Sequence, residues 1–470
     1  MSSTPGSHPA SALAYRRRNA WDCLSPAGKE SVFAFAEEYK QFLNDAKTER
    51  EAVAAAAGYA VRTGFTPLDS KNKLAPGDRV FAVGRGKSII LAVIGKASPE
   101  SGLKIVGAHV DSPRLDLKPQ PLYEDEWLTL LKTHYYGGVK KYQWLAVPLS
   151  LHGVVVKSDG TAVPVVIGER PGDPVFTITD LLPHLAKDQM EKKLSDAFAG
   201  ENLNLLAGGI PLGDSELKDR FKLAVLDLLH REYGIREEDL ISAELEAVPA
   251  WSSRDVGFDR SFVGGYGQDD RVCAFAALRA IGDVALPSRT ALVLLADKEE
   301  TGSAGNTGMQ SAFFANFVAE IILRAGGSYS ELALRRSLSA STALSADVNA
   351  GFDPNFPDVL EKMNAARAGG GLVLTKYTGS KGKYGTNDAH AEVMACARRL
   401  FDRAGVVWQT GELGKVDQGG GGTIAHYLAE YGMDVLDCGV ALLSMHAPFE
   451  VCSKVDVYMA YKGYNAFLSE

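Results

Sequence analysis

Acidic and histidine side chains follow short apolar runs at several places in this chain. The clearest case is the run from Thr290 to Ala296, which leads to two adjacent carboxylates, Glu299 and Glu300, and then to a Gly-Ser turn. A short apolar run bounded by turn residues is typical of a buried strand in a parallel sheet. Open α/β sheets place their chemistry just past the carboxyl ends of such strands. One glutamate could therefore bind a metal ion while the other faces water or substrate, although the pair alone could also simply solvate a strand end.

Four further residues have a similar placement. His109, Asp347 and His446 end apolar runs, and Asp269 precedes a predicted helix. Histidines and carboxylates without cysteine match the ligands of a hydrolytic zinc site. Two ions about 3.5–4 Å apart would need one bridging carboxylate, and a free carboxylate would accept a proton from water. Each residue alone also fits an ordinary role, such as a core histidine or a helix N-cap, so the prediction depends on their combination.

The elements that must position these residues are those of an α/β domain. Periodicity predicts strands at 79–83, 88–94, 103–110, 147–156, 162–167, 290–296, 340–347 and 435–443, and helices at 26–60, 223–233, 271–281, 309–323 and 386–404. Between about Leu115 and Pro249 the pattern changes to strands separated by glycine turns. We therefore predict a catalytic α/β domain in two parts, 1–117 and 251–470, interrupted by a β-rich domain at 118–250.

Composition excludes several classes of protein. The 470 residues suffice for two or more domains, and the net charge of −8 argues against nucleic acid as the main partner. The five cysteines are scattered without a CxxC pair, so neither a disulfide framework nor a thiolate zinc site is expected, and a reducing cytoplasm fits best. The N-terminal stretch lacks the apolar core of a signal peptide, and no apolar run reaches the roughly 18 residues of a membrane span.

Five motifs in order, HVDSP, GGYGQDD, DKEETGS, SADVNAG and SMHAPFE, resemble the aspartyl aminopeptidase family of co-catalytic zinc exopeptidases, in a bacterial-type member. The segments Tyr136–Trp144 and Lys383–Asn387 match as well, and the resemblance runs from about residue 15 to the C-terminus. It implies a three-layer zinc-peptidase α/β domain with an inserted β-rich dimerisation domain. It also implies assembly of dimers into a tetrahedral dodecamer that acts on peptides with a free N-terminus.

The resemblance also implies a role for each candidate residue. The ligands of two divalent metal ions would be His109 and Asp347 for one, His446 and Glu300 for the other, and Asp269 as the bridge. Glu299 would be the general base, and Asp111 would orient His109. A metal ion lowers the pKa of its water towards about 7, so an unligated glutamate can take that proton and pass it to the leaving amine. Zinc is the expected metal, and cobalt or manganese suits the same ligands.

Some alternatives stay open at this point. Family members that prefer acidic N-terminal residues carry a histidine shortly after the metal-binding aspartate, whereas the segment from Val348 to Asp353 has none, so a neutral or hydrophobic first residue is compatible. The same core could serve another metal-dependent amide hydrolase, either a carboxypeptidase or a deacylase. A non-catalytic assembly protein is disfavoured, since a structural site has no use for a free base. The run Gly419–Gly422 lacks the lysine of a P-loop, which argues against nucleotide binding.

Overall fold

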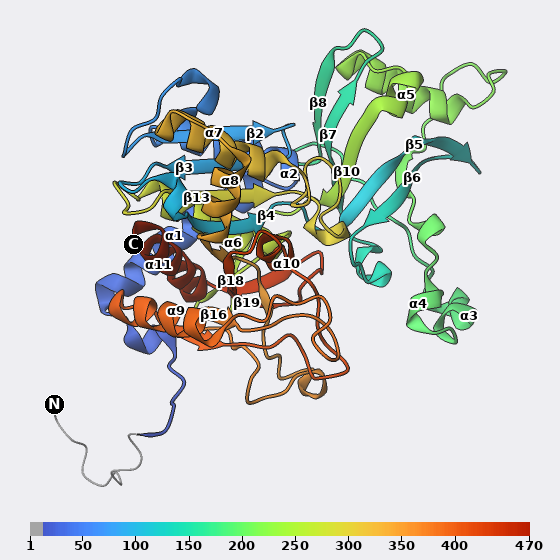
Figure 1. Ribbon diagram of the computed structural model, residues 1–470. Coiled ribbons are helices and arrows are strands. Elements are labelled where there is room, and N and C mark those ends of the chain that lie inside the picture. The colour runs from blue at the N-terminus through green and yellow to red at the C-terminus, as the bar shows by residue number, and fades with distance from the viewer. Residues whose placement is uncertain (1–12) are drawn as a thin grey trace.

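The computed structural model describes residues 13–470, so residues 1–12 of the predicted 1–117 segment lie outside the described part. The body of the molecule is a nine-stranded sheet with the order β1-β2-β3-β13-β4-β14-β18-β16-β17 (Figure 1). Its strands are β1 (Thr66–Pro67), β2 (Arg79–Gly84), β3 (Ser88–Val93), β4 (Lys104–His109), β13 (Ala291–Ala296), β14 (Thr342–Ser345), β16 (Leu372–Thr375), β17 (Trp408–Thr410) and β18 (Asp434–Gly439).

Helices cover both faces of this sheet. One face packs against α1 (Pro26–Asp45), α2 (Glu49–Arg62), α6 (Gln268–Gly282), α9 (Ala391–Arg403) and α11 (Lys454–Ser469). The other face packs against α7 (Phe313–Gly326), α8 (Glu331–Ser339) and α10 (Ala425–Ala429). Because successive side chains of a strand point to opposite faces, Leu91 joins the first core and Ile90 the second. Strands covered on both faces read as continuous apolar runs, and the α/β class predicted from such runs is confirmed.

The sheet is mixed rather than parallel, so the prediction of a parallel sheet around 290–296 is only partly correct. β13 runs parallel to β4 but antiparallel to β3. β3 in turn pairs antiparallel with β2, and only Arg85, Gly86 and Lys87 lie between these two strands. A connection that short can join only antiparallel neighbours, which explains the orientation of β3 against β2.

Several predicted boundaries shift by a few residues, and three predicted elements differ more substantially from the structure. The predicted helix 26–60 is two helices, because Thr48 caps α2: its hydroxyl accepts from the Glu51 backbone N–H, and the Glu51 carboxylate accepts from Thr48 in return. The predicted helix 386–404 begins at Ala391. The predicted strand 435–443 is two strands, β18 and β19, in different sheets. At Gly439, where β18 ends, an added Cβ would lie 1.8 Å from the Asp347 carbonyl oxygen, so the backbone passes the site too closely for any other residue.

A second sheet, of six strands in the order β8-β7-β10-β5-β6-β9, projects from one side of the body (Figure 1). Its strands are β5 (Arg114–Asp125), β6 (Leu128–Tyr136), β7 (Leu149–Val156), β8 (Ala162–Ile167), β9 (Leu205–Gly208) and β10 (Ala243–Pro249), accompanied by α3 (Lys187–Met190), α4 (Leu194–Ala197) and α5 (Arg220–Tyr233). It has a hydrophobic core of its own around Trp144 and Leu149. All of its strands lie between Arg114 and Pro249, the region where the sequence pattern changes.

A third sheet has five strands in the order β11-β12-β20-β19-β15. Its strands are β11 (Arg254–Val256), β12 (Phe262–Gly265), β15 (Asn349–Ala350), β19 (Ala441–Leu443) and β20 (Glu450–Ser453). The loop from β19 to β20 contains His446, and β12 leads into α6, which contains Asp269. Among residues 13–470, no helix combines the length and apolar character needed to cross a membrane.

Candidate metal centre

Three adjacent strands bring one group of the predicted residues together. β13, β4 and β14 are neighbours that run parallel, so their carboxyl ends meet at one edge of the sheet. His109 is the last residue of β4, Glu299 and Glu300 follow β13, and Asp347 follows β14. His109 is 1% exposed, which places its ring inside the protein rather than at the surface. This edge is where an open α/β sheet places its chemistry.

Asp269 lies between the two predicted histidine ligands. Its Oδ1 is 3.2 Å from His109 Nε2, and its Oδ2 is 3.2 Å from His446 Nε2. Asp269 is in the first turn of α6, and its carboxylate is buried. One carboxylate therefore presents a separate oxygen to each histidine, which is the arrangement that a bridging ligand requires.

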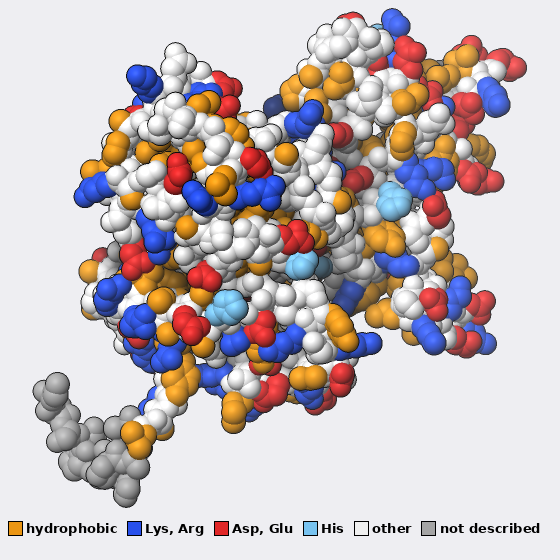
Figure 2. All heavy atoms as spheres, in the orientation of Figure 1, with side chains coloured by type: hydrophobic (Ala, Val, Ile, Leu, Met, Phe, Trp, Pro, Cys, Tyr) orange, Lys and Arg blue, Asp and Glu red, His pale blue; other side chains and the backbone are white. Residues whose placement is uncertain are grey.

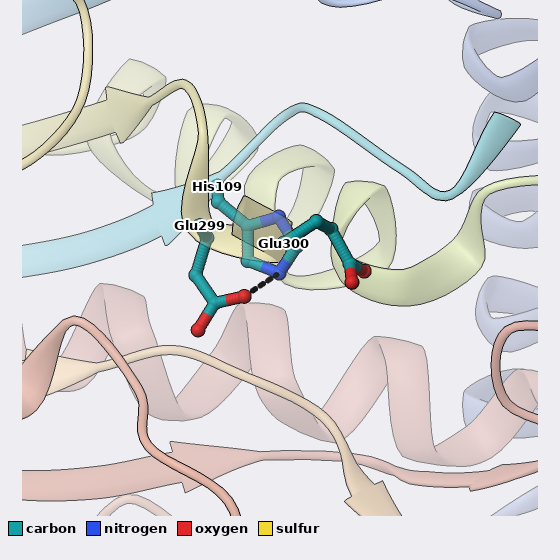
Figure 3. A group of neighbouring side chains, drawn as sticks. All are labelled: His109, Glu299 and Glu300. Atoms are coloured by element: carbon teal, nitrogen blue, oxygen red, sulfur yellow. Dashed lines mark ion pairs between the residues drawn. The ribbon is translucent and has the colours of Figure 1, made fainter. Parts of the chain in front are cut away.

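The two glutamates occupy different positions around the histidines. Glu300 Oε1 lies 3.6 Å from His446 Nε2, and Glu299 Oε2 lies 3.9 Å from His109 Nε2, the contact that Figure 3 marks. In Figure 3 the two side chains leave the backbone in different directions, Glu299 toward the His109 ring and Glu300 away from Glu299. The adjacent glutamates can therefore perform different functions, as their placement after a strand end suggests.

Each of three side-chain groups has its potential ligand atoms within 4.8 Å of one another. The groups are His109 with Glu299 and Glu300, His109 with Asp270 and Asp347, and Asp269 with Glu300 and His446. The five residues predicted as ligands all belong to these groups, and Glu299 does too. Imidazole nitrogens and carboxylate oxygens suit zinc. Buried oxygens of Glu300 and Asp270 have no hydrogen-bond partner among the described residues, so they are free to bind a cation.

Asp111 holds both His109 and the glutamate loop. Its Oδ1 lies 3.3 Å from His109 Nδ1, and its backbone carbonyl lies 3.1 Å from the same nitrogen. Since both neighbours accept, the hydrogen of the neutral ring belongs on Nδ1, which leaves Nε2 free to bind a metal. The backbone N–H groups of Glu299 and Glu300 also donate to the Asp111 carboxylate, over 3.1 and 3.2 Å. These contacts are the ones expected of a carboxylate that orients His109, and Asp111 in addition accepts from the backbone of both glutamates.

His446 is oriented by a backbone group instead. Its Nδ1 lies 2.9 Å from the Gly138 carbonyl oxygen, which again leaves Nε2 free. The side chain is 34% exposed, whereas that of His109 is 2% exposed. The two halves of the site therefore differ in depth, and the half that contains His446 is the one open to solvent.

Burial and the crowding of carboxylates together shift the pKa values in the site. Burial raises the pKa of Glu299 to about 7, and the charges of Asp269 and Asp111 act in the same direction. Burial and the charge of Asp269 raise the pKa of Glu300 well above its usual range. Burial lowers the pKa of His446, but the hydrogen bond with Asp269 outweighs it and raises that pKa to about 10. The site concentrates negative charge, which a divalent cation would neutralise.

Three residues of the site were not predicted. Asp270 is not a metal ligand in the predicted scheme, yet its carboxylate lies close to the potential ligand atoms of His109 and Asp347. Its Oδ2 also accepts from the His109 backbone N–H. Glu450 accepts backbone N–H groups on both sides of the centre: Gln268 over 2.6 Å and Asp269 over 3.2 Å on Oε2, and His446 over 2.8 Å on Oε1. The third is Tyr136, which donates to Asp111. Both Asp270 and Glu450 lie inside the motifs GGYGQDD and SMHAPFE, the only sequence signal that could have indicated them.

Comparison with known proteins gives consistent results. Residues 42–468 match the family model described as aminopeptidase I zinc metalloprotease (M18). A Clostridium acetobutylicum protein described as a probable M18 family aminopeptidase 1 is 53% identical over 456 residues, which cover 96% of this chain and 98% of that protein. The crystal structure of an M18 family aminopeptidase from Thermotoga maritima is 48% identical, covers 97% of this chain and 100% of that one, and superposes with a TM-score of 0.94. A structure described as the S. cerevisiae mApe1 dodecamer shares the fold, with 23% identity and a TM-score of 0.73 over 92% of this chain and 95% of that one.

Proposed function

We propose that this chain, which belongs to the M18 family of zinc metalloproteases and is an aminopeptidase, uses a centre of two divalent metal ions to release N-terminal residues from peptides. The observation that carries this proposal is Asp269, which presents one oxygen to His109 and the other to His446 at equal distances of 3.2 Å. His109 and Asp347 would hold one ion, and His446 and Glu300 the other. The ions would be zinc, and cobalt or manganese would suit the same nitrogen and oxygen ligands.

Two ions in this centre would lower the pKa of water and polarise the scissile carbonyl. Glu299 is the general base of the proposal, since it lies beside His109, and since burial raises its pKa to about 7 against the opposing charge of His109. A base with a pKa near the working pH is efficient in both directions of proton transfer. Glu299 would take a proton from the attacking water and give it to the leaving amine.

The remaining residues of the centre would keep these groups in place. Asp111 would hold His109 as the Nδ1–H tautomer and fix the backbone of Glu299, so the base and one ligand share a single anchor. Glu450 would couple the backbone of Asp269 to that of His446. Such contacts set ligand orientation and basicity.

We also propose that residues 118–250 form a dimerisation domain, and that dimers assemble into a tetrahedral dodecamer. Support comes from the relative described as a dodecamer and from large apolar side chains exposed on the six-stranded region, such as Trp127 at 77% and Ile210 at 83%. Figure 2 shows hydrophobic side chains on the visible face of this part, mixed with acidic and basic side chains as on the rest of that face. The five cysteines are free, in keeping with the proposed cytoplasmic location.

Hydrolysis of a panel of aminoacyl anilides tests the proposed function. We expect release from substrates with a free α-amino group, loss of release on chelation, and recovery on addition of zinc, cobalt or manganese. The panel also identifies the preferred first residue, for which the segment Val348–Asp353 leaves neutral and hydrophobic side chains open. Substrates with a blocked N-terminus are the control. Cleavage only of substrates with a blocked N-terminus and a free C-terminal carboxylate would favour a carboxypeptidase or deacylase, and chelator-resistant activity would contradict the metal centre.

A further inference from the structure

We infer that Tyr136, at the end of β6 in the six-stranded sheet, is a positioning residue for the metal centre of the body and acts through Asp111. Its phenolic Oη donates to Asp111 Oδ2 over 2.8 Å. The inference rests on the proposed metal centre, to which it adds a residue from the six-stranded sheet. The six-stranded sheet would then help to position the metal centre, in addition to being a candidate surface for assembly.

Asp111 is the residue through which Tyr136 would act. It is fully buried. Its Oδ1 accepts from the Glu299 backbone N–H and lies beside His109 Nδ1, and its Oδ2 accepts from the Glu300 backbone N–H. The Tyr136 hydroxyl is the one contact of this carboxylate, among those found in the described residues, that comes from the six-stranded sheet. A buried carboxylate with fixed donors on both oxygens has a single orientation, and that orientation determines where His109 and the glutamate backbone lie.

The Tyr136 ring is itself held firmly. Arg114, its partner in the β5–β6 ladder, places its guanidinium 3.9 Å from the ring centroid. Arg114 is 5% exposed and forms ion pairs with Glu49 over 3.4 Å and with Glu246 over 3.1 Å. A cation held over an aromatic face in a buried setting resists movement of the ring. The hydroxyl therefore reaches Asp111 in a fixed direction, and a phenylalanine would keep the ring contact while losing only the hydroxyl.

The residues after Tyr136 approach the other half of the centre. The Gly138 carbonyl oxygen accepts from His446 Nδ1 over 2.9 Å. A Cβ on Gly137, whose φ is +72°, would lie 3.3 Å from Glu300 Oε2, and a Cβ on Gly138 would lie 3.1 Å from His446 Nδ1. The end of β6 and the glycines after it therefore contact both halves of the centre. Tyr136 contacts Asp111, which lies beside His109, and Gly138 contacts His446 directly. This double contact is what distinguishes the segment from ordinary packing.

The test compares two Tyr→Phe variants of the full-length protein. Tyr136→Phe removes the hydroxyl that reaches Asp111. Tyr461→Phe is the control for the loss of a tyrosine hydroxyl. Tyr461, on α11, is also half-buried and donates over 2.6 Å to a carboxylate, that of the exposed Asp283, away from the centre. Zinc affinity is measured by competition with a chromophoric chelator, together with kcat, KM and the melting temperature of the metal-free protein.

For Tyr136→Phe we expect zinc affinity and kcat each to fall by about tenfold, with little change in KM. A tenfold loss is the lower end of the range for residues that orient a metal ligand. Tyr461→Phe should keep zinc affinity and kcat. Wild-type affinity and kcat in Tyr136→Phe would overturn the inference while leaving the metal centre intact. Failure of the wild-type protein to bind zinc would instead refute the proposed function.

A double-mutant cycle with Asp111→Ala separates action through Asp111 from independent packing. If Tyr136 acts through Asp111, the loss of zinc affinity caused by Tyr136→Phe should disappear in the Asp111→Ala background. Additive losses in the double variant would show that the hydroxyl acts by another route and would overturn the inference. The readout is the same chelator competition, so the cycle does not depend on activity.

Discussion

The metal centre and the junction with the six-stranded sheet bury carboxylates in opposite ways. At the junction, Glu49 faces Lys87 and Arg114, and Glu169 faces Lys47. At the centre, the ion pairs found among the described residues join carboxylates only to histidines, and none joins them to lysine or arginine. Both regions lie within the same molecule and include fully buried glutamate or aspartate side chains.

This difference in partners changes the pKa values of similar groups. Burial raises the pKa of Glu49, but Arg114 and Lys87 outweigh it and lower that pKa to about 2. Burial raises the pKa of Glu299 to about 7, where neighbouring carboxylates add to the effect. Glu246 shares Arg114 with Glu49 and is an exception at the junction, since burial raises its pKa well above the usual range. Paired buried charges are a structural device, whereas a cluster of carboxylates without a cationic side chain indicates a site for a metal ion.

The largest effect on kcat is expected for Glu299→Gln, which tests the distinction between carboxylates of the centre and ion-paired carboxylates of the junction. Loss of the base should lower kcat by about 10²- to 10⁴-fold, while zinc binding is retained because Glu299 is not a proposed ligand. The measurement is steady-state hydrolysis of the best anilide, with zinc content determined in parallel. Glu169→Gln at the junction is the control and should keep kcat. Full activity of Glu299→Gln would falsify the assigned base.

The substitution Glu450→Gln tests a different kind of carboxylate at the metal centre. Glu450 is buried and has no cationic side-chain partner among the described residues, but it is not a proposed metal ligand. Gln can present only one oxygen, so at least one of the three backbone N–H groups it receives would lose its acceptor. We expect a loss of about 1–3 kcal/mol in the free energy of unfolding, together with weaker zinc binding. Urea unfolding of the metal-free protein and chelator competition measure the two effects.

The matched control for Glu450 is Asp456→Asn in α11. Asp456 is also fully buried and accepts the backbone N–H groups of Gly369 and Gly371, over 2.7 Å each. It should lose stability similarly and keep zinc affinity. Equal zinc affinities of the two variants would argue against a role for Glu450 in positioning the ligands.

The smallest expected effect is a change in the pH dependence of stability at the junction. His152 lies 2.7 Å from Glu51 and 3.1 Å from Glu169; burial lowers its pKa, but the hydrogen bonds with these carboxylates raise it above the usual value. A histidine with a raised folded-state pKa stabilises the protein fully below its unfolded pKa of about 6.5, and this stabilisation is lost as pH rises through the folded-state pKa. His152→Gln should therefore flatten the decline of unfolding free energy above about pH 6.5. Identical slopes in urea titrations of the two metal-free proteins would contradict the assignment.

The sequence pattern was sufficient to predict those parts of the fold and of the candidate centre in which a site residue directly follows an apolar strand. Apolar runs ending in His109, Glu299 and Asp347 mark strands that prove to be adjacent, so a rule about strand ends was enough to group them. His446 was expected from one strand of the same kind, but the run 435–443 divides at Gly439 and places His446 on a loop of another sheet. Glu450 and Tyr136 were not predicted because their roles depend on hydrogen bonds to distant residues, such as Glu450 to Asp269, which no local periodicity encodes.

The central claim is that Asp269 joins two metal ions in one centre, and zinc stoichiometry tests it most directly. Equilibrium dialysis followed by elemental analysis would be carried out on the wild-type protein, Asp347→Ala, Glu300→Ala and Asp269→Ala. We predict two ions per wild-type chain, one in each of the Asp347 and Glu300 variants, and none retained in Asp269→Ala, because both sites lose a ligand there. A single ion in the wild-type protein, or two ions in Asp269→Ala, would contradict the account.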